Sequence, residues 1–253
     1  MPPLSRTHPA RRAIRVTLAA LAALSATALA TPAAAQIRGG HVDDFEGGTT
    51  AGWGVGAGQP GQAHPAPPVV VGGGRTGAAD DFLRITALGA NGPFGADGPG
   101  SRLSAYNVGS AWQGDYLSAG VTGISFWARN FGASDVFLRL AVVTFPAEPG
   151  PPTNAALSQT AVVLSANSGW SFYTLSLAPG ALFAPIGTAE GALRNVTELR
   201  FYHSAAPGFP PPVFAGVIGL DDITATTVPE PATLALVAGG LALLGVGARR
   251  RRG

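Results

Sequence analysis

Acidic residues gather at the two ends of the central part of the chain, and their oxygens offer the chemistry that a hard cation needs. Asp43, Asp44 and Glu46 stand near its start, and Asp221 and Asp222 stand near its end. Calcium takes about six to eight oxygen ligands, which carboxylates and backbone carbonyls supply together. If the two ends meet in the fold, we expect Asp44, Glu46 and Asp222 to hold a structural calcium ion. The alternative is a solvated acidic edge with local turn hydrogen bonds.

Three segments of the sequence pair an aromatic residue with an arginine two positions away. Residues two apart share one face of a strand, because side chains alternate between the faces. The six residues are Trp127, Arg129, Phe137, Arg139, Arg200 and Tyr202. Aromatic rings stack on flat apolar surfaces such as sugar faces, and arginine binds carboxylates or sulfates through paired hydrogen bonds. Such a surface would suit an anionic polysaccharide, and these six residues are the candidate ligand face. Glu198 shares that face and could neutralise one arginine. The interpretation we favour is that the residues form cross-strand pairs that stabilise the sheet, or a second layer covered by loops.

Catalytic signatures are missing from the sequence. His41, His64 and His203 match no zinc-ligand spacing, and no Gly-x-Ser-x-Gly sequence occurs. The glycine-rich segments 56–61 and 72–76 lack the context of nucleotide-binding loops. With 13 acidic residues between positions 36 and 228, a pair at the separation that glycosidases use would arise by chance. We therefore expect no enzymatic activity.

Short predicted strands must position these residues. Runs rich in β-branched and aromatic residues alternate in polarity and are separated by glycine, proline and asparagine. Ile124 and Phe126 share one face of such a run, and Leu199 and Phe201 share one face of another. We expect strands near 41–46, 67–71, 81–87, 101–106, 121–129, 135–143, 159–164, 170–177, 196–203 and 215–226, with at most a turn or two of helix in 181–194. Many short strands without alternating helices predict an all-β antiparallel sandwich.

Three stretches resemble strands of carbohydrate-binding-module-like jelly rolls with a galactose-binding-type fold. They are Asp43-Asp44-Phe45-Glu46 followed by Gly52-Trp53, Gly169-Trp170 leading into Phe172-Tyr173-Thr174-Leu175, and Gly219-Leu220-Asp221-Asp222-Ile223. The resemblance implies a jelly-roll sandwich over 36–227 in which the first and last strands pair. It also implies that carboxylates and loop carbonyls there hold a structural calcium. A jelly roll can host a lyase or hydrolase in its concave face, so an enzyme is the competing interpretation.

The N-terminal residues have the three parts of a secretory signal peptide. Four arginines between positions 6 and 15 precede an apolar stretch over 16–30, and the small residues of 33–35 supply a cleavage site. We expect signal peptidase to remove residues 1–35, so that the exported protein begins at Gln36.

The last 26 residues, 228–253, form a second signal. Pro229, Glu230 and Pro231 precede an apolar run over 232–248 and four arginines. This order resembles the PEP-CTERM signal of Gram-negative bacteria, whose members are exported, read by a membrane-embedded exosortase and cut near the motif. The apolar run spans about 25 Å as a helix, slightly less than the ~30 Å hydrocarbon core of a bilayer. We therefore expect a transient membrane segment with an exosortase as partner; an ordinary membrane anchor is the alternative.

Charge and cysteine content exclude further classes of function. Residues 36–228 carry 8 Arg, no Lys and 13 Asp and Glu, a net charge of −5. They therefore offer no basic surface for nucleic acid. The chain has no Cys, which excludes disulfides, thiol catalysis and Cys-based metal sites.

These features predict a non-catalytic exported protein of the cell envelope or extracellular matrix that binds polysaccharide. A secreted polysaccharide lyase or hydrolase and a purely structural matrix protein remain the competing interpretations.

Replacing Glu230 by Ala should leave the protein in the inner membrane. The sorting motif is lost in this variant, while the apolar stretch and the arginines that stop transfer remain. Cell fractionation followed by immunoblotting checks the outcome. If the variant reaches its destination at normal levels, the tail is only an anchor.

Overall fold

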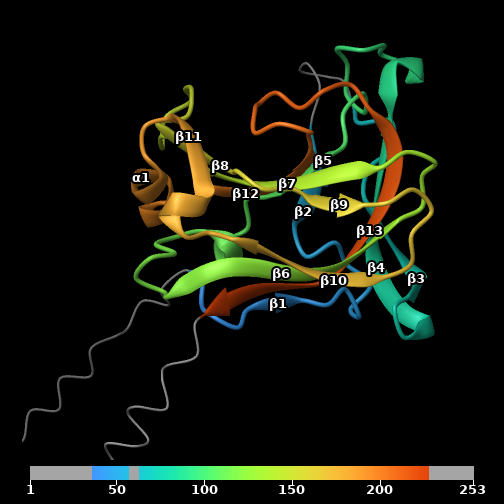
Figure 1. Cartoon of the computed structure of the whole chain (residues 1–253), viewed down its shortest axis with the longest axis horizontal. Coiled ribbons are helices and arrows are strands. Elements are labelled where there is room, and N and C mark those ends of the chain that lie inside the picture. Colours follow the sequence, from blue (N-terminus) through green and yellow to red (C-terminus); the bar gives the residue numbers. More distant parts are fainter. Residues whose placement is uncertain (1–35, 57–62, 228–253) are drawn as a thin grey trace, which may run out of the picture. The chain divides into compact units, whose positions relative to one another are not determined.

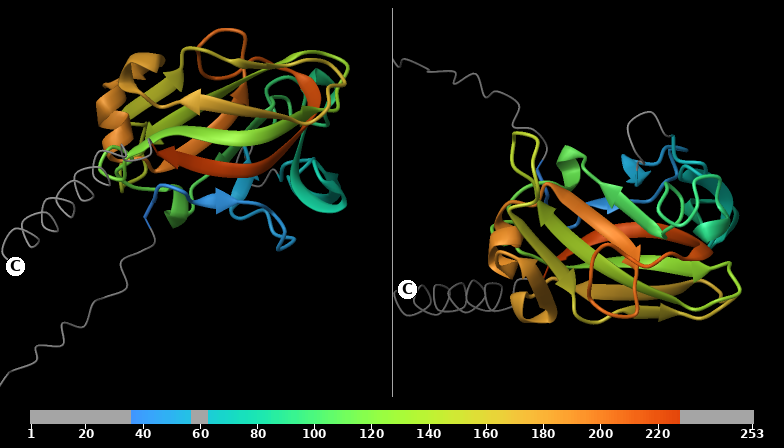
Figure 2. Two further views of the ribbon diagram at one scale, coloured as in Figure 1. Left: turned by 60° about the horizontal axis from the view of Figure 1, so that its bottom comes forward. Right: turned by 90° about the horizontal axis from the view of Figure 1, so that it is seen from above.

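The described residues fold into two antiparallel β-sheets that pack face to face (Figures 1 and 2). The computed structural model describes residues 36–56 and 63–227. Within these ranges the regular helix is limited to α1 (Ala189–Arg194) and three 3₁₀ turns (Gly89–Asn91, Ser110–Trp112 and Pro179–Ala181). The predicted all-β antiparallel sandwich is therefore confirmed. The signal peptide predicted in 1–35 and the apolar helix predicted in 228–253 lie outside the described residues.

Sheet A contains the first and the last strand of the described domain. Its strands run in the order β10–β6–β13–β4–β3, with β1 added along β13. They are β10 (Ser171–Ser176), β6 (Val121–Asn130), β13 (Ala215–Thr227), β4 (Gly77–Leu88), β3 (Val69–Gly74) and β1 (Val42–Asp43). Val42 is in register with Thr224, and Asp43 with Ile223. The two ends of the domain therefore meet, as the sequence predicts.

Sheet B supplies the second layer, in the order β11–β8–β7–β12–β5–β2, with β9 added along β7. Its strands are β11 (Leu182–Ile186), β8 (Asn154–Ser158), β7 (Val136–Thr144), β12 (Glu198–His203), β5 (Ser104–Asn107), β2 (Trp53–Val55) and β9 (Val162–Leu164). β2, β8 and β11 are not predicted from the sequence, because they are short and contain glycine, alanine or proline in place of an alternating apolar run.

The segment 181–194 divides into two different elements. Its first part forms β11, which pairs with β8. Its second part forms α1, which begins after Thr188, where the hydroxyl oxygen accepts a hydrogen bond from the Gly191 N–H at 2.9 Å. This N-cap satisfies one of the free donors at the helix start.

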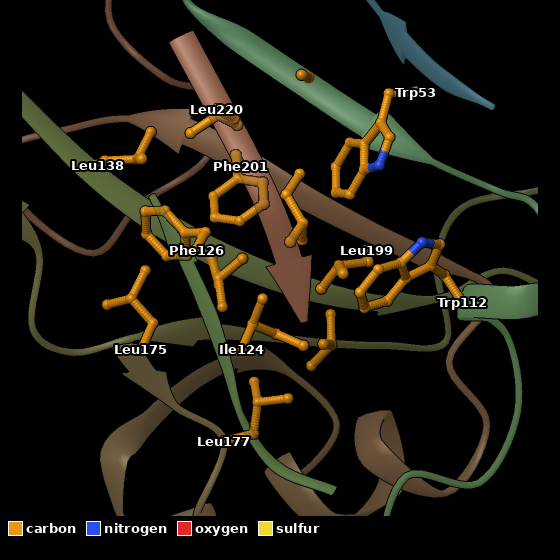
Figure 3. Packing of buried hydrophobic residues seen from close by; sticks show 14 of the residues in the cluster. Trp53, Trp112, Ile124, Phe126, Leu138, Leu175, Leu177, Leu199, Phe201 and Leu220 are labelled. Carbon is orange, nitrogen blue, oxygen red and sulfur yellow. The ribbon is translucent and has the colours of Figure 1, made fainter. Parts of the chain in front are cut away.

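The core lies between the two sheets and is built from the alternating apolar positions (Figure 3). The inward residues of β6 and β7 are 1% exposed or less: Ile124, Phe126, Ala128, Val136, Leu138, Leu140 and Val142. Phe126 of sheet A meets Phe201 of sheet B edge to face, with ring centroids 4.9 Å apart. Burial of each large apolar side chain contributes about 1.5–3 kcal/mol, so this interface supplies most of the favourable folding free energy.

Asp43 brings a buried carboxylate into this apolar interior. Its Oδ2 atom accepts hydrogen bonds from Nε1 of Trp53 and from Nε1 of Trp112, both at 2.7 Å. Asp43 belongs to β1 of sheet A and Trp53 to β2 of sheet B, while Trp112 ends a 3₁₀ turn. Figure 3 shows the two indole rings at one end of the core. The carboxylate therefore joins the two layers through a pair of charge-assisted hydrogen bonds.

An aromatic layer covers part of the outer face of sheet A. Trp170 packs edge to face on Phe82, with ring centroids 5.0 Å apart, and Phe131 stacks on Phe82 at 5.6 Å. Gly219 on β13 makes room for this layer, because a Cβ there would lie 2.7 Å from the Trp170 ring and 2.8 Å from the Phe82 ring. Sheet A therefore has a partly closed outer face.

Replacing Asp43 by Ala should destabilise the protein by about 2–5 kcal/mol, because two buried indole N–H groups lose their acceptor. Urea unfolding followed by tryptophan fluorescence measures the loss. Asp44→Ala is the matched control, since the Asp44 side chain is exposed and its loss should change stability by no more than about 0.5 kcal/mol. Equal losses at both positions would show that the bridge between the sheets contributes nothing.

Candidate functional site

A groove with a volume of ≈ 380 Å³ lies over the outer face of sheet B. Its size is within the range of natural small-ligand sites, about 300–1,000 Å³. The lining is mostly apolar, and it draws on four strands and two loops. The lining residues are Ala141, Val143, Phe145, Pro152, Ala155, Leu157, Pro185, Ile186, Glu198, Arg200 and Phe209.

The floor of the groove is formed by buried aliphatic residues, and larger exposed residues stand around it. Ala141 and Val143 of β7 and Ala155 and Leu157 of β8 stand on the outer face of the sheet, opposite the inward core residues of the same strands. Phe145, Ile186 and Phe209 rise around them and are 38%, 40% and 52% exposed. Exposed apolar groups of this size around one hollow are typical of ligand or partner sites.

Arg139 is buried beside the groove, at 4% exposure, and acts as a structural connector. Its guanidinium donates to the carbonyl oxygens of Ser204 and Ala205 at 2.8 and 2.7 Å, and to those of Ser158 and Gln159 at 2.8 Å each. These carbonyls belong to the loop after β12 and to the end of β8. Arg139 therefore ties the loop that carries Phe209 to the strand that forms the floor of the groove.

Arg200 and Glu198 supply the charged part of the groove lining. Arg200 Nε donates to Glu198 Oε1 at 2.7 Å, and the pair is only 16% and 7% exposed. The guanidinium carbon lies 5.1 Å from the centroid of the Tyr106 ring and 5.0 Å from that of Phe209. The sequence predicts that Glu198 could neutralise one arginine, and the structure pairs it with Arg200.

The six residues of the predicted ligand face do not form one surface. Trp127 and Arg129 lie on β6 of sheet A, whereas the other four lie on β7 and β12 of sheet B. The prediction that these side chains point away from the core is correct. Alternation along a strand does not show which sheet that strand joins, however, so the predicted single face combines the outer faces of two different sheets. Tyr202 is also fully buried, and burial raises the pKa of its hydroxyl to about 12.

On sheet A, Trp127 and Arg129 make contacts within the protein. The Arg75 guanidinium lies 5.2 Å from the centroid of the Trp127 ring, and the Phe172 ring lies 5.5 Å from it. Arg129 stacks on Phe131 at 4.4 Å and donates from Nε to the Ser168 carbonyl at 3.2 Å.

The three residues predicted to bind calcium each have a partner within the protein. Asp44 Oδ1 accepts the Glu46 N–H at 3.3 Å, Glu46 Oε1 accepts the Asp81 N–H at 3.1 Å, and Asp222 pairs with Arg75 at 2.7 Å. Across 36–56 and 63–227, no group of three or more His, Asp or Glu side chains is placed to hold a metal ion. Calcium binding stays a prediction from the sequence.

Asp221 precedes Asp222 on β13 and is 1% exposed. Burial, with the nearby charges of Asp222 and Asp80, raises the pKa of its carboxyl to about 7. Asp222 itself has a φ of 47°, at a point where the pairing of β13 with β6 shifts register. This bulge brings the Asp222 N–H to 2.8 Å from Asp221 Oδ1.

Sequence reasoning missed most of the groove. Phe145 and Phe209 lie in loops, and Ala155 lies on a strand that the sequence does not predict. The outward position of Ala141 follows from the alternation of β7, but alanine has no chemical signature that marks it as the floor of a site.

Comparison with known sequences confirms the tail signal. The model of the PEP-CTERM protein-sorting motif matches residues 227–252, against 228–253 predicted. The chain therefore carries this sorting motif. A search of curated proteins found no match. Within the described residues, no helix is both long and apolar enough to cross a membrane.

Among solved structures, the chain is similar to a family 11 carbohydrate-binding module from Clostridium thermocellum in complex with a β-1,3-1,4-mixed-linked tetrasaccharide. That match has 15% identity and a TM-score of 0.48, and it covers 77% of this chain and 99% of the other. An exo-β-agarase matches with 10% identity and a TM-score of 0.48, over 74% of this chain and 24% of the other. The adhesin domain of Lys-gingipain from Porphyromonas gingivalis matches with 13% identity and a TM-score of 0.38, over 75% and 99%.

The raised pKa of Asp221 predicts a pH-dependent stability. The folded protein holds this proton up to about pH 7, whereas the ordinary value is 3.8. The stabilisation is therefore complete below about pH 4 and is lost as the pH rises through 7. Urea unfolding between pH 4 and 8 should show this slope in the wild type and not in Asp221→Asn.

Histidines titrate in the same pH range. The contribution of Asp221 is therefore the difference between the pH slopes of the unfolding free energy in the wild type and in the variant. Asp97→Asn is the control, since the Asp97 side chain is 99% exposed. The prediction fails if Asp221→Asn keeps the slope of the wild type.

Proposed function

We propose that this chain is an exported, exosortase-sorted protein of the cell envelope or extracellular matrix whose groove over sheet B binds a polysaccharide without changing it chemically. The observation that carries the proposal is the open groove itself. It combines an aliphatic floor with exposed phenylalanines and one charged pair. Phe145 and Phe209 offer aromatic faces to the apolar faces of sugar rings, and Glu198 and Arg200 offer hydrogen bonds to hydroxyl groups.

The lining of the groove favours binding over hydrolysis. Glycosidases of the common type use two carboxyl groups, about 5–9.5 Å apart, as acid and nucleophile or base. Among the described residues that line this groove, Glu198 is the one carboxylate, and it is already paired with Arg200. A single carboxylate held in an ion pair is a poor candidate for either role.

The sorting motif at 227–252 supports the cellular side of the proposal. The motif follows directly on β13, which ends at Thr227. Signal peptidase and an exosortase would then process the two ends, and the membrane would be contacted only through the C-terminal segment before processing. The folded domain between them is left to act outside the inner membrane.

Removing the ring of Phe209 should weaken polysaccharide binding by about tenfold or more, which corresponds to about 1.4 kcal/mol, as for an aromatic residue at the centre of an interface. Phe172→Ala is the matched control. Both phenylalanines are more than half exposed, at 52% and 55%, but Phe209 lies in the loop after β12 and lines the groove, whereas Phe172 lies on β10 of sheet A. Affinity electrophoresis of the exported protein in gels that contain polysaccharide from the producing cells gives the measurement.

Urea unfolding of both variants is the necessary second measurement. Each ring is exposed, so each loss of stability should stay within about 1 kcal/mol. If Phe172→Ala loses binding while Phe209→Ala keeps it, the ligand lies on sheet A and the groove is not the site. If the wild type is not retarded by any polysaccharide fraction, the binding function itself is rejected.

A further inference from the structure

The charges in and around the groove specify which class of polysaccharide it can take. Glu198 and Arg200 are the charged residues among those that line it in the described part of the chain. Glu198 pairs with Arg200 at 2.7 Å, so the groove has no net positive charge to attract an anion. An acidic sugar would have to bring a carboxylate or sulfate next to the buried Glu198 carboxylate, and this like-charge contact disfavours its binding.

The geometry of Arg200 also leaves little room for an acidic ligand. An arginine captures a carboxylate or sulfate by presenting two parallel N–H groups along one edge. Arg200 uses Nε for Glu198 and one terminal nitrogen for the Ser104 hydroxyl at 3.3 Å. Tyr106 and Phe209 lie against its guanidinium at 5.1 and 5.0 Å. Each edge of the guanidinium therefore has a donor already in use.

Arg139, the other arginine of sheet B near the groove, is equally committed. Its guanidinium donates to four backbone carbonyl groups and is 4% exposed. Removing it from these carbonyls to bind a ligand would leave the buried carbonyls of Ser158 and Ser204 without this partner. In the described part of the chain, both arginines of sheet B near the groove are thus already engaged with acceptors of the protein.

The net charge of the whole domain also disfavours the binding of acidic polysaccharides. Residues 36–227 carry 8 Arg and 13 Asp and Glu, a net charge of −5. A polyanion that approaches this surface is repelled, most strongly at low ionic strength, where the Debye length is long. A chain of uncharged sugars meets no such barrier, and its hydroxyl groups suit the remaining acceptor sites of Glu198.

We infer that the groove over sheet B selects an uncharged polysaccharide and excludes acidic ones, with Glu198 as the residue that sets this specificity. The inference rests on the proposed function. It replaces the anionic ligand that the aromatic–arginine pairs suggest in the sequence, because the structure gives these arginines partners within the protein. The neutral ligand stacks on Phe145 and Phe209, and its hydroxyl groups donate hydrogen bonds to Glu198.

The test uses chemically matched polymers and the exported protein. Anion exchange separates the polysaccharide of the producing cells into neutral and acidic fractions. Two commercial pairs, each sharing one polymer backbone, complete the set: dextran and dextran sulfate, and hydroxyethylcellulose and carboxymethylcellulose. Affinity electrophoresis should show retardation by neutral members, and binding to the acidic member of a pair should be weaker on the order of tenfold or more. Neutral binding should change by less than about twofold between 20 and 500 mM NaCl, since no ion pair forms with the ligand.

Glu198→Gln probes the specificity residue. It removes the repelling charge and leaves Arg200 uncompensated, so the ratio of acidic to neutral binding should rise on the order of tenfold. Glu190→Gln is the matched control, because Glu190 is exposed on α1 and does not line the groove; its ratio should equal that of the wild type.

The possible outcomes separate this inference from the proposed function. Binding to acidic polymers that falls steeply with salt, or an unchanged ratio in Glu198→Gln, overturns the neutral specificity and leaves polysaccharide binding intact. No retardation by any neutral or acidic polymer overturns both.

Discussion

The carboxylate of Asp43 is the interaction on which the two layers depend. It sits 7% exposed in an apolar interior, where an isolated charge is very costly, and two indole N–H groups offset that cost. Because β1 comprises only two residues, its backbone pairing with β13 is short. The side chain of Asp43 therefore holds the N-terminal segment in place and spans from sheet A to a tryptophan of sheet B. A chain without cysteine has no covalent alternative for this connection.

Arginine has a comparable role on the outer side of sheet B. The guanidinium group has five donors in a fixed plane, which suits it to loop ends where several carbonyl oxygens converge. Arg139 uses this property to fix the loop after β12, and Arg200 is held between aromatic rings and Glu198. The charged residues near the groove thus fix the elements around it, while most of its lining is aliphatic and aromatic.

Much of the fold follows from the sequence, because burial repeats at every second residue of a strand. β6, β7 and β12 are predicted in place and with the correct inward residues. The groove could not be predicted in the same way. Its floor needs β8, whose five residues lack a strand signal, and its walls come from loops that depend on contacts far apart in the chain. The alternation also does not show which sheet a strand joins, so Trp127 and Arg139 share one predicted face although they lie on different sheets.

The position of β13 has a consequence for the order of events during export. This strand lies in the middle of sheet A, between β4 and β6, and ends at Thr227. In the sequence, Val228 alone separates its end from Pro229. Sheet A can therefore close only after almost the whole polypeptide has crossed the membrane, when the sorting motif itself is arriving. An enzyme that reads the motif therefore acts on residues that directly follow a central strand of sheet A. Once sheet A has formed, its size limits how closely that enzyme can approach the motif.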